Sequence, residues 1–191
     1  MSDLLALITI MVWPVVPLFW IPVHGFPEVF KRLGILTYLL HLIVWLPIAY
    51  LIYRNRFFLI HNKIDFPETL RMAGAVLFFV GLILHLWTGK LLGIFGLMGL
   101  PEISTKEKGV LITRGPFSIV RHPTYLAHTL LFVGIFFITE VIAVGVLAFI
   151  DFAIVNAFIL PLEEKELLSR FGDEYKLYKQ RVRYRFFPKL F

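Results

Sequence analysis

Long apolar runs separated by short polar stretches dominate the pattern of this 191-residue chain. Each run is close to the ~20 residues that a helix needs to cross the hydrocarbon core of a bilayer. The pattern therefore predicts an all-α integral membrane protein with five transmembrane helices. The five runs cover residues 4–23, 33–53, 72–89, 123–139 and 141–162.

Breaks in the pattern predict how the helices bend and connect. The first run contains Pro14, Pro17 and Pro22, which indicate a kinked or broken helix. Residues 91–100 are apolar but too short to span, and their three glycines indicate a bent or interfacial segment. Only Glu140 separates the last two runs, so we expect a tight helical hairpin whose open ends lie on one side.

The basic residues are distributed unevenly about these runs. If the chain crosses five times, one face carries 15 of the 19 Lys and Arg residues, including the segment 106–121 and the C-terminal tail. Because cytoplasmic loops are enriched in Lys and Arg, we expect that face to be cytoplasmic and the N-terminus to lie outside. The hairpin then brings residues 102–122 next to residues 163–191, and we expect these two polar blocks to form one site.

The tail after the fifth run has a helical pattern of its own. Its apolar residues recur at helical spacing with charged residues between them, which predicts an amphipathic helix that Gly172 can break. Such a helix on the cytoplasmic surface fits two roles: a cap over the site, or a basic membrane anchor. The apolar positions are Leu167, Leu168, Phe171, Tyr175, Tyr178 and Val182.

Composition narrows the possible classes of protein. Hydrophobic residues make up 59% and charged residues 17%, with a mean hydropathy of +0.81, whereas a soluble domain has about 25% charged residues. The absence of cysteine excludes disulfides, thiolate metal sites and a thiol nucleophile. The net charge of +6 does not indicate nucleic-acid binding, because the basic residues cluster at the ends of apolar runs. We expect the first run to be a retained span, and no spacing predicts a dinucleotide, phosphate-loop or metal site.

The sharpest local motif is Arg121-His122-Pro123-Thr124-Tyr125. Pro123 is suited to the first position of a helix, where its missing N–H has no intrahelical partner to lose. The free amides and the positive dipole end of that helix then favour an anion beside Arg121 and His122. The same residues also fit a place under lipid head groups, which is common for Arg at a span boundary.

Acidic and polar residues near the fifth run leave further alternatives open. Glu163 and Glu164 fit the first turn of the tail helix, but Asn156 and Glu163 are seven residues apart and fall on one face of a regular helix. Asp151 lies inside a span, and we expect it to be a structural partner of His85 or His128. We expect His41 and His85 to be packing or hydrogen-bonding residues.

Taken together, residues 102–188 resemble the isoprenylcysteine carboxyl methyltransferase family. The resemblance rests on Gly-Val-Leu-Ile-Thr-Arg-Gly-Pro-Phe (109–117), Arg-His-Pro-Thr-Tyr (121–125), Pro-Leu-Glu-Glu-Lys-Glu-Leu-Leu (161–168) and Phe-Gly-Asp-Glu-Tyr (171–175). It implies an integral membrane enzyme that uses S-adenosylmethionine without a Rossmann domain. On this basis we expect one membrane domain, 1–191, with three spans in 1–90 and a catalytic core in 91–191.

The resemblance also implies where the cofactor binds. Arg121, Glu164 and Asn156 are candidates for positioning the reactants, whereas no catalytic residue is assigned. Ile159 stands near the position where eukaryotic members carry an arginine tied to substrate binding. The residues expected to bind the cofactor are Glu102, Gly109, Val110, Leu111, Ile112, Phe117, His122, Pro123, Thr124, Tyr125 and Glu163.

The activity that the resemblance implies is methyl transfer to the carboxylate of a lipid-like, prenylcysteine-type substrate at the cytoplasmic face. A sulfonium methyl group is already activated and a carboxylate is ionised near pH 7, so this reaction needs no dedicated base. Two alternatives stay open: a phospholipid amine N-methyltransferase, and a non-catalytic lipid-binding or transport protein. We expect a monomer in contact with membrane lipids.

Overall fold

The computed structural model describes residues 2–106 and 109–187, and within these ranges the chain is helical with no named strand. This confirms the predicted all-α fold. The N-terminal helices are α1 (Ser2–Val12), α2 (Val15–Gly25), α3 (Pro27–Leu33), α4 (Leu36–Arg54), α5 (Arg56–His61), α6 (Glu68–Leu97) and α7 (Leu100–Ile103). The C-terminal helices are α8 (Pro123–Thr139), α9 (Ile142–Ile154), α10 (Leu160–Phe171) and α11 (Asp173–Arg181).

Four helical stretches of the described chain are long and apolar enough to cross a bilayer: Ser2–Gly25, Leu36–Arg54, Glu68–Ile103 and Ile142–Phe171. The remaining predicted run, the fourth, is α8, which is apolar but shorter, at 17 residues. The outward surfaces of α4 and α6 consist of exposed apolar side chains such as Ile43 and Ile83. Because water disfavours such surfaces, they are suited to contact with lipid, and the predicted integral membrane fold is confirmed.

Prolines and glycines break the helices where the sequence indicates. The first run divides at Trp13–Pro14 into α1 and α2. In α6 the backbone leaves the helical region at Gly93, with φ 71° and ψ 167°, and the bent segment continues to the left-handed Gly99 before α7 begins. The predicted bend in residues 91–100 is therefore confirmed.

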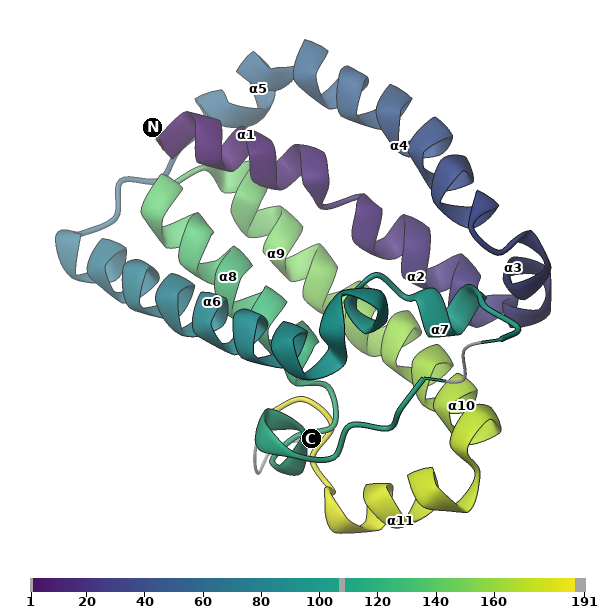
Figure 1. Cartoon of the computed structure of the whole chain (residues 1–191). Helices are drawn as coiled ribbons and strands as arrows, with labels where there is room; N and C mark the ends of the chain where they lie inside the picture. The colour runs from purple at the N-terminus through teal and green to yellow at the C-terminus, as the bar shows by residue number, and fades with distance from the viewer. Residues whose placement is uncertain (1, 107–108, 188–191) are drawn as a thin grey trace.

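The central contact of the fold joins α6 to α8, which lie side by side in Figure 1. Small residues bring the two backbones together: a Cβ atom added at Gly134 would lie 2.6 Å from the Phe78 nitrogen and 2.8 Å from the Gly74 oxygen. On α6, a Cβ atom added at Gly81 would lie 3.0 Å from the Ala127 oxygen. Close backbone approach through small residues is a usual way to hold membrane helices together.

The predicted hairpin is formed by α8 and α9, which turn at Glu140 with a left-handed φ of 64°. A single turn of π-helix, Val155–Ile159, then joins α9 to α10. The helix therefore continues past the predicted end at residue 162 and stops at Phe171, and the first half of the predicted tail helix belongs to it. The predicted break at Gly172 is confirmed, and α11 follows it.

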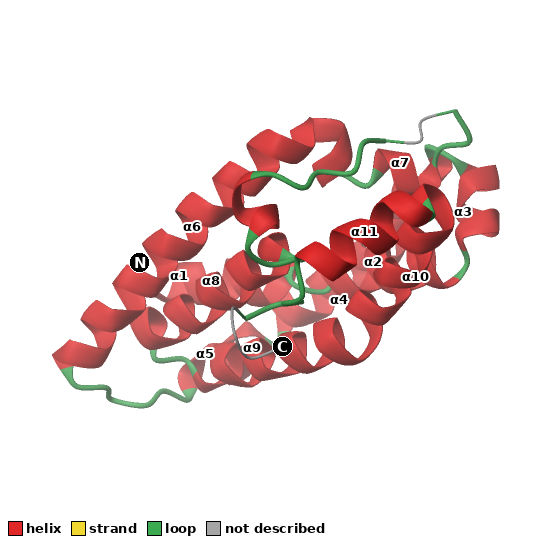
Figure 2. Ribbon diagram, turned by 90° about the horizontal axis from the view of Figure 1, so that it is seen from below, coloured by secondary structure: helices red, strands yellow, loops and turns green. Residues whose placement is uncertain are grey.

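The C-terminal tail returns to the start of α8. The amides of Arg121 and His122 donate to the carbonyls of Tyr184 and Arg185, at 2.9 and 3.0 Å. Phe186 is fully buried in a cluster with Tyr125 and residues of the π turn. In Figure 2 the segment containing α11 crosses the end of the helical bundle. The two polar blocks are therefore adjacent, as predicted.

Candidate functional site

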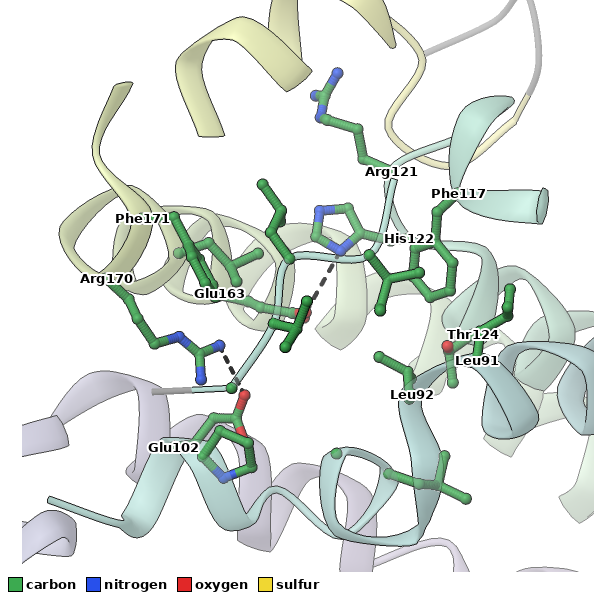
Figure 3. A pocket seen from close by; sticks show the side chains of 18 of the residues that line it. Leu91, Leu92, Glu102, Phe117, Arg121, His122, Thr124, Glu163, Arg170 and Phe171 are labelled. Carbon is green, nitrogen blue, oxygen red and sulfur yellow. Dashed lines mark hydrogen bonds and ion pairs between the residues drawn. The ribbon is translucent and has the colours of Figure 1, made fainter. Parts of the chain in front are cut away.

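A cavity of about 920 Å³ lies between the two polar blocks and the end of the helical bundle (Figure 3). Most of its wall is apolar, and ionisable side chains gather on the segments around α7, α10 and the start of α8. The charged or ionisable wall residues are His85, Glu102, Arg114, Arg121, His122, Tyr125, His128, Glu163, Arg170, Tyr175 and Tyr178.

Glu163 and His122 form the centre of the polar wall. The Glu163 Oε1 atom lies 3.6 Å from Nδ1 of His122, and the imidazole is almost completely buried. Burial lowers the pKa of His122, but the neighbouring carboxylates of Glu163 and Glu164 raise it by more, so that this pKa lies above its ordinary value. The other Glu163 oxygen, Oε2, is buried and has no hydrogen-bond partner. A buried carboxylate oxygen with spare capacity is suited to a ligand's amino or hydroxyl group.

A second ionic group faces Glu163 across the cavity, as Figure 3 shows. The Arg170 Nη2 atom donates to Oε1 of Glu102 at 2.9 Å and lies 3.2 Å from Oε2 of Glu166. Here too polar atoms are left over, because Glu102 Oε2 and Arg170 Nε are buried without hydrogen-bond partners. The wall therefore offers a ligand both acceptors and a guanidinium.

The segment 109–117 closes the cavity on another side. Gly109 has a left-handed φ of 71°, and a Cβ atom there would lie 3.0 Å from Pro101 and 3.7 Å from Nη1 of Arg170. Only glycine adopts this conformation without strain and leaves room for the neighbouring Arg170. Residues 110–112 then run along the wall, and Phe117 is held by its carbonyl, which accepts 2.7 Å from the Tyr178 hydroxyl.

The structure places most residues of the predicted cofactor site on this one wall. Pro123 is the exception, because it lies beside the wall as the first residue of α8. Those on the wall are Glu102, Gly109, Val110, Leu111, Ile112, Phe117, His122, Thr124, Tyr125 and Glu163.

Arg121 borders the cavity, but its guanidinium points away from it, as Figure 3 shows. Its Nε donates 2.9 Å to Oε1 of Glu164, and its Nη1 donates to the carbonyls of Val182 and Arg183. Glu164 also accepts hydrogen bonds from Lys179 and Arg185. Two of the three residues predicted to position reactants, Arg121 and Glu164, thus form a buried ion cluster that fastens the tail to α8 and α10.

Asn156 is absent from the cavity wall, and its Nδ2 donates to the carbonyl of Phe152 on its own helix. The π turn explains this placement: with an extra residue in one turn, positions seven apart no longer share a face. The expected pairing of Asp151 with a histidine is wrong, because Oδ1 of Asp151 accepts 2.8 Å from Nε1 of Trp13. His41 is a hydrogen-bonding residue as predicted, with Thr37 and Leu18 carbonyls beside its ring nitrogens.

Sequence reasoning missed several wall residues. Tyr175 had a signal, since it ends the motif Phe-Gly-Asp-Glu-Tyr, and Arg170 stands directly before that motif, but both were interpreted only as parts of an amphipathic helix. The Tyr175 hydroxyl is buried without a hydrogen-bond partner, and burial raises the pKa of this phenol, so it stays neutral. Trp20, Leu91 and Phe95 come from elements that carried no recognised motif.

The cavity also reaches two histidines on α6 and α8. The rings of His85 and His128 lie with their centroids 4.9 Å apart. On α8, His122, Tyr125 and His128 succeed one another at intervals of three residues, with ring centroids 6.2 Å apart at each step. The cavity therefore has an ionic end and an end where two imidazoles face each other.

Comparison with known proteins identifies the family. The sequence profile described as "Phospholipid methyltransferase" matches residues 70–174, which is more than half of the chain. The chain belongs to the phospholipid methyltransferase family. The matched residues contain α6 to α10, and so most of the cavity wall. This confirms the assignment to the membrane methyltransferases that the sequence motifs indicated.

Individual relatives of this family member differ in what their names describe. The cobalt-zinc-cadmium resistance protein CzcN of Cupriavidus metallidurans is 30% identical over 115 residues, covering 54% of this chain and 52% of the relative. Methanethiol S-methyltransferase 1 of Bradyrhizobium diazoefficiens is 33% identical over 111 residues, covering 54% and 38%. The nickel-cobalt-cadmium resistance protein NccN of Alcaligenes xylosoxydans is 34% identical over 88 residues, covering 46% and 40%. The matches thus span about half or less of these curated relatives.

The family sets the reaction class but leaves the substrate open. A methyltransferase of this kind implies S-adenosylmethionine as the methyl donor. The names of the relatives do not agree on one acceptor.

Proposed function

We propose that this phospholipid methyltransferase family member binds S-adenosylmethionine in the cavity between the two polar blocks and transfers its methyl group to an apolar acceptor. The observation that carries the proposal is the pair of partly buried carboxylates, Glu102 and Glu163, each on the cavity wall with one buried oxygen that has no hydrogen-bond partner in the described residues. Such oxygens are suited to the amino group and ribose hydroxyls of this cofactor.

The other wall residues fit the remaining parts of the cofactor. The guanidinium of Arg170 and the first amides of α8 beside His122 are suited to its carboxylate. The side chains of Leu111, Ile112 and Phe117 offer an apolar surface to the adenine. When bound, the cofactor supplies a sulfonium methyl group that is already activated for transfer. What the protein adds is placement of the acceptor in line with that methyl group and exclusion of water.

The acceptor predicted from the sequence is the carboxylate of a prenylcysteine-type compound. The exposed Arg114 on the cavity's edge is a cation that can receive an anionic group from solvent. Exposed apolar residues of the wall, Phe95 and Val110, make an edge that an alkyl or prenyl chain can cross from the bilayer. The carboxylate would then react without a base.

A second candidate acceptor is a thiol. Two observations favour it: the relative named methanethiol S-methyltransferase 1, and the histidine pair at the other end of the cavity. A thiol with a pKa near 8.5 is mostly protonated at pH 7, so a base beside it is useful.

We also propose the orientation and the state of assembly. The excess of Lys and Arg on the face that contains the tail favours a cytoplasmic active site. The cavity is formed by one chain, which favours a monomer as the active unit, with membrane lipids around α4 and α6.

Binding of S-adenosylhomocysteine to the detergent-solubilised protein tests the cofactor site. We expect Glu163→Gln and His122→Ala to weaken binding while the proteins stay folded. Glu174→Gln, the same change at an exposed position of α11, serves as the matched control and is expected to bind normally. Unchanged affinity in both site variants would reject the site, and no binding by the wild type would favour a non-catalytic lipid-binding protein.

Methyl transfer to three acceptors then tests the substrate class. N-acetyl farnesylcysteine supplies a carboxylate, phosphatidylethanolamine an amine and 1-octanethiol a thiol. Methylation of farnesylcysteine alone would support the sequence-based prediction, whereas methylation of phosphatidylethanolamine alone would favour the phospholipid amine alternative.

A further inference from the structure

His85 and His128 stand out because they bring two imidazoles together on the cavity wall. Their rings face each other from α6 and α8 at 4.9 Å, tilted by 34°. The Nδ1 atom of each ring is buried and has no hydrogen-bond partner within residues 2–106 and 109–187. A purely structural buried histidine usually has such a partner, because an unsatisfied polar atom costs about 1–3 kcal/mol.

The position of the pair along α8 relates it to the ionic end of the cavity. His128 is six residues beyond His122, which corresponds to about 9 Å along the helix axis at 1.5 Å per residue. Tyr125 lies between them, with ring centroids 6.2 Å from each. A ligand bound against His122 and Glu163 therefore leaves the histidine pair within the same cavity, at the depth where an acceptor would enter.

Within the described part of the chain, neither imidazole of the pair forms an ion pair with a carboxylate. The carboxylates that do pair with a histidine there are Glu163 and Glu164, and both contact His122. The acidic wall residues, Glu102 and Glu163, belong to the ionic end. The pair therefore offers proton-accepting nitrogens that are not paired with a carboxylate.

We propose that His85 and His128 receive a thiol acceptor and take its proton, an inference that rests on the proposed methyltransferase function. An alkyl thiol enters an apolar cavity uncharged and then needs one base before it becomes a good nucleophile. A carboxylate would arrive as an anion and an alkylamine as a cation, and neither would meet a charged partner in the two imidazoles. Each of those charges would be desolvated without compensation.

In the proposed methyl transfer, the S–H bond of the acceptor breaks. Its proton moves to a nitrogen of one imidazole in the pair, and that ring becomes an imidazolium. The sulfur's electron pair forms a bond to the methyl carbon, while the bond between that carbon and the donor's sulfonium sulfur breaks and leaves its electrons there. The products are a methyl thioether and a neutral donor thioether, and the imidazolium returns its proton to water.

The decisive experiment compares His85→Gln and His128→Gln with wild type, using 1-octanethiol and an aromatic thiol that is already ionised at neutral pH. The control is His61→Gln, which removes an exposed imidazole on α5 outside the cavity. We expect kcat for 1-octanethiol to fall by about 10²-fold or more, the usual contribution of a general base. We expect a much smaller loss for the ionised thiol, and S-adenosylhomocysteine affinity unchanged in all three variants.

A second readout needs no turnover. Diethyl pyrocarbonate modifies neutral imidazoles, and peptide mass spectrometry locates the modified residues. In the protein without cofactor, methyl octyl sulfide, the product of 1-octanethiol methylation, is expected to protect His85 and His128 but not His61. Equal modification of His85 and His128 with and without methyl octyl sulfide would contradict the proposal.

The outcomes of these experiments distinguish failure of the histidine proposal from failure of the proposed methyltransferase function. Equal losses for the octane and aromatic thiols would mean that the histidines shape the cavity without acting as a base. Bound S-adenosylhomocysteine with methylation of farnesylcysteine or phosphatidylethanolamine but no thiol would overturn this inference and leave the proposed function standing. Absence of S-adenosylhomocysteine binding would overturn the proposed function itself.

Discussion

Replacing Glu164 with glutamine tests how the C-terminal tail is fastened over the cavity. The Glu164 carboxylate is 6% exposed and accepts hydrogen bonds from Arg121, Lys179 and Arg185. Nε2 of His122 lies 3.4 Å from its Oε1. Glutamine keeps the shape of the side chain and one acceptor oxygen, but it removes the negative charge around which these cations gather.

The expected loss follows from which partners are buried. The Arg121 side chain is 7% exposed, whereas those of Lys179 and Arg185 are 46% and 35% exposed. Pairs with the latter two contribute little, because water screens them. Removing one partner of a buried ion pair costs about 3–5 kcal/mol. Arg121 keeps the carbonyls of Val182 and Arg183, so we expect a loss of about 3 kcal/mol, at the lower end of that range.

Hydrogen exchange measures this loss locally. The amides of Arg121 and His122 are bonded to the tail carbonyls of Tyr184 and Arg185, so they report opening of the tail. A loss of about 3 kcal/mol corresponds to exchange about 10²-fold faster at these amides, since about 1.4 kcal/mol is a factor of ten. Glu174→Gln is the control for an exposed carboxylate. Equal protection in wild type and Glu164→Gln would refute the view that this cluster holds the tail.

Three further outcomes follow from the packing and the charges. Gly134→Ala forces a methyl group to within 2.6 Å of the Phe78 nitrogen on α6 and should destabilise the protein by about 1–3 kcal/mol in thermal unfolding, whereas Gly25→Ala, with open space around it, should not. Trp13→Phe leaves the buried Asp151 carboxylate without its hydrogen-bond donor and should cost about 1–3 kcal/mol of stability with little effect on cofactor affinity; an unchanged melting temperature would contradict this. Because the pKa of His122 is raised in the folded protein, its contribution to stability is complete below the ordinary value near 6.5 and is lost as the pH rises through the raised one. Wild type should therefore melt lower as pH rises through that window, and His122→Gln should show a flatter profile.

The sequence predicted those parts of the fold that depend on hydrophobic runs and helix breakers. The apolar runs, the break at Pro14, the turn at Glu140 and the stop at Gly172 all follow from local chemistry. What it could not predict is the π turn of Val155–Ile159, because the run around it is almost uniformly apolar and a change of face leaves no mark on the pattern. That turn is why Asn156 and Glu163 do not share a face.

The sequence also could not predict which charged residues form ion pairs with one another. The sequence brings Arg121, Arg170, Glu163 and Glu164 to one end of the bundle, but it does not say which cation meets which carboxylate. In the fold Arg121 donates hydrogen bonds to Glu164 and to carbonyls of the tail, whereas Arg170 is the arginine that pairs with Glu102 on the cavity wall. Such pairings depend on side-chain directions over more than forty residues of sequence separation, as the Arg121–Glu164 bond illustrates.

The proposed methyl transfer depends on binding of S-adenosylmethionine in the cavity between the two polar blocks. Ultraviolet cross-linking of methyl-tritiated S-adenosylmethionine to the purified protein, followed by peptide mapping, shows where this cofactor binds. We expect the label on peptides from residues 109–125 or 160–178, and we expect unlabelled S-adenosylhomocysteine to compete and remove this label. Absence of competable label, or label confined to α1, α4 or α5, would contradict it.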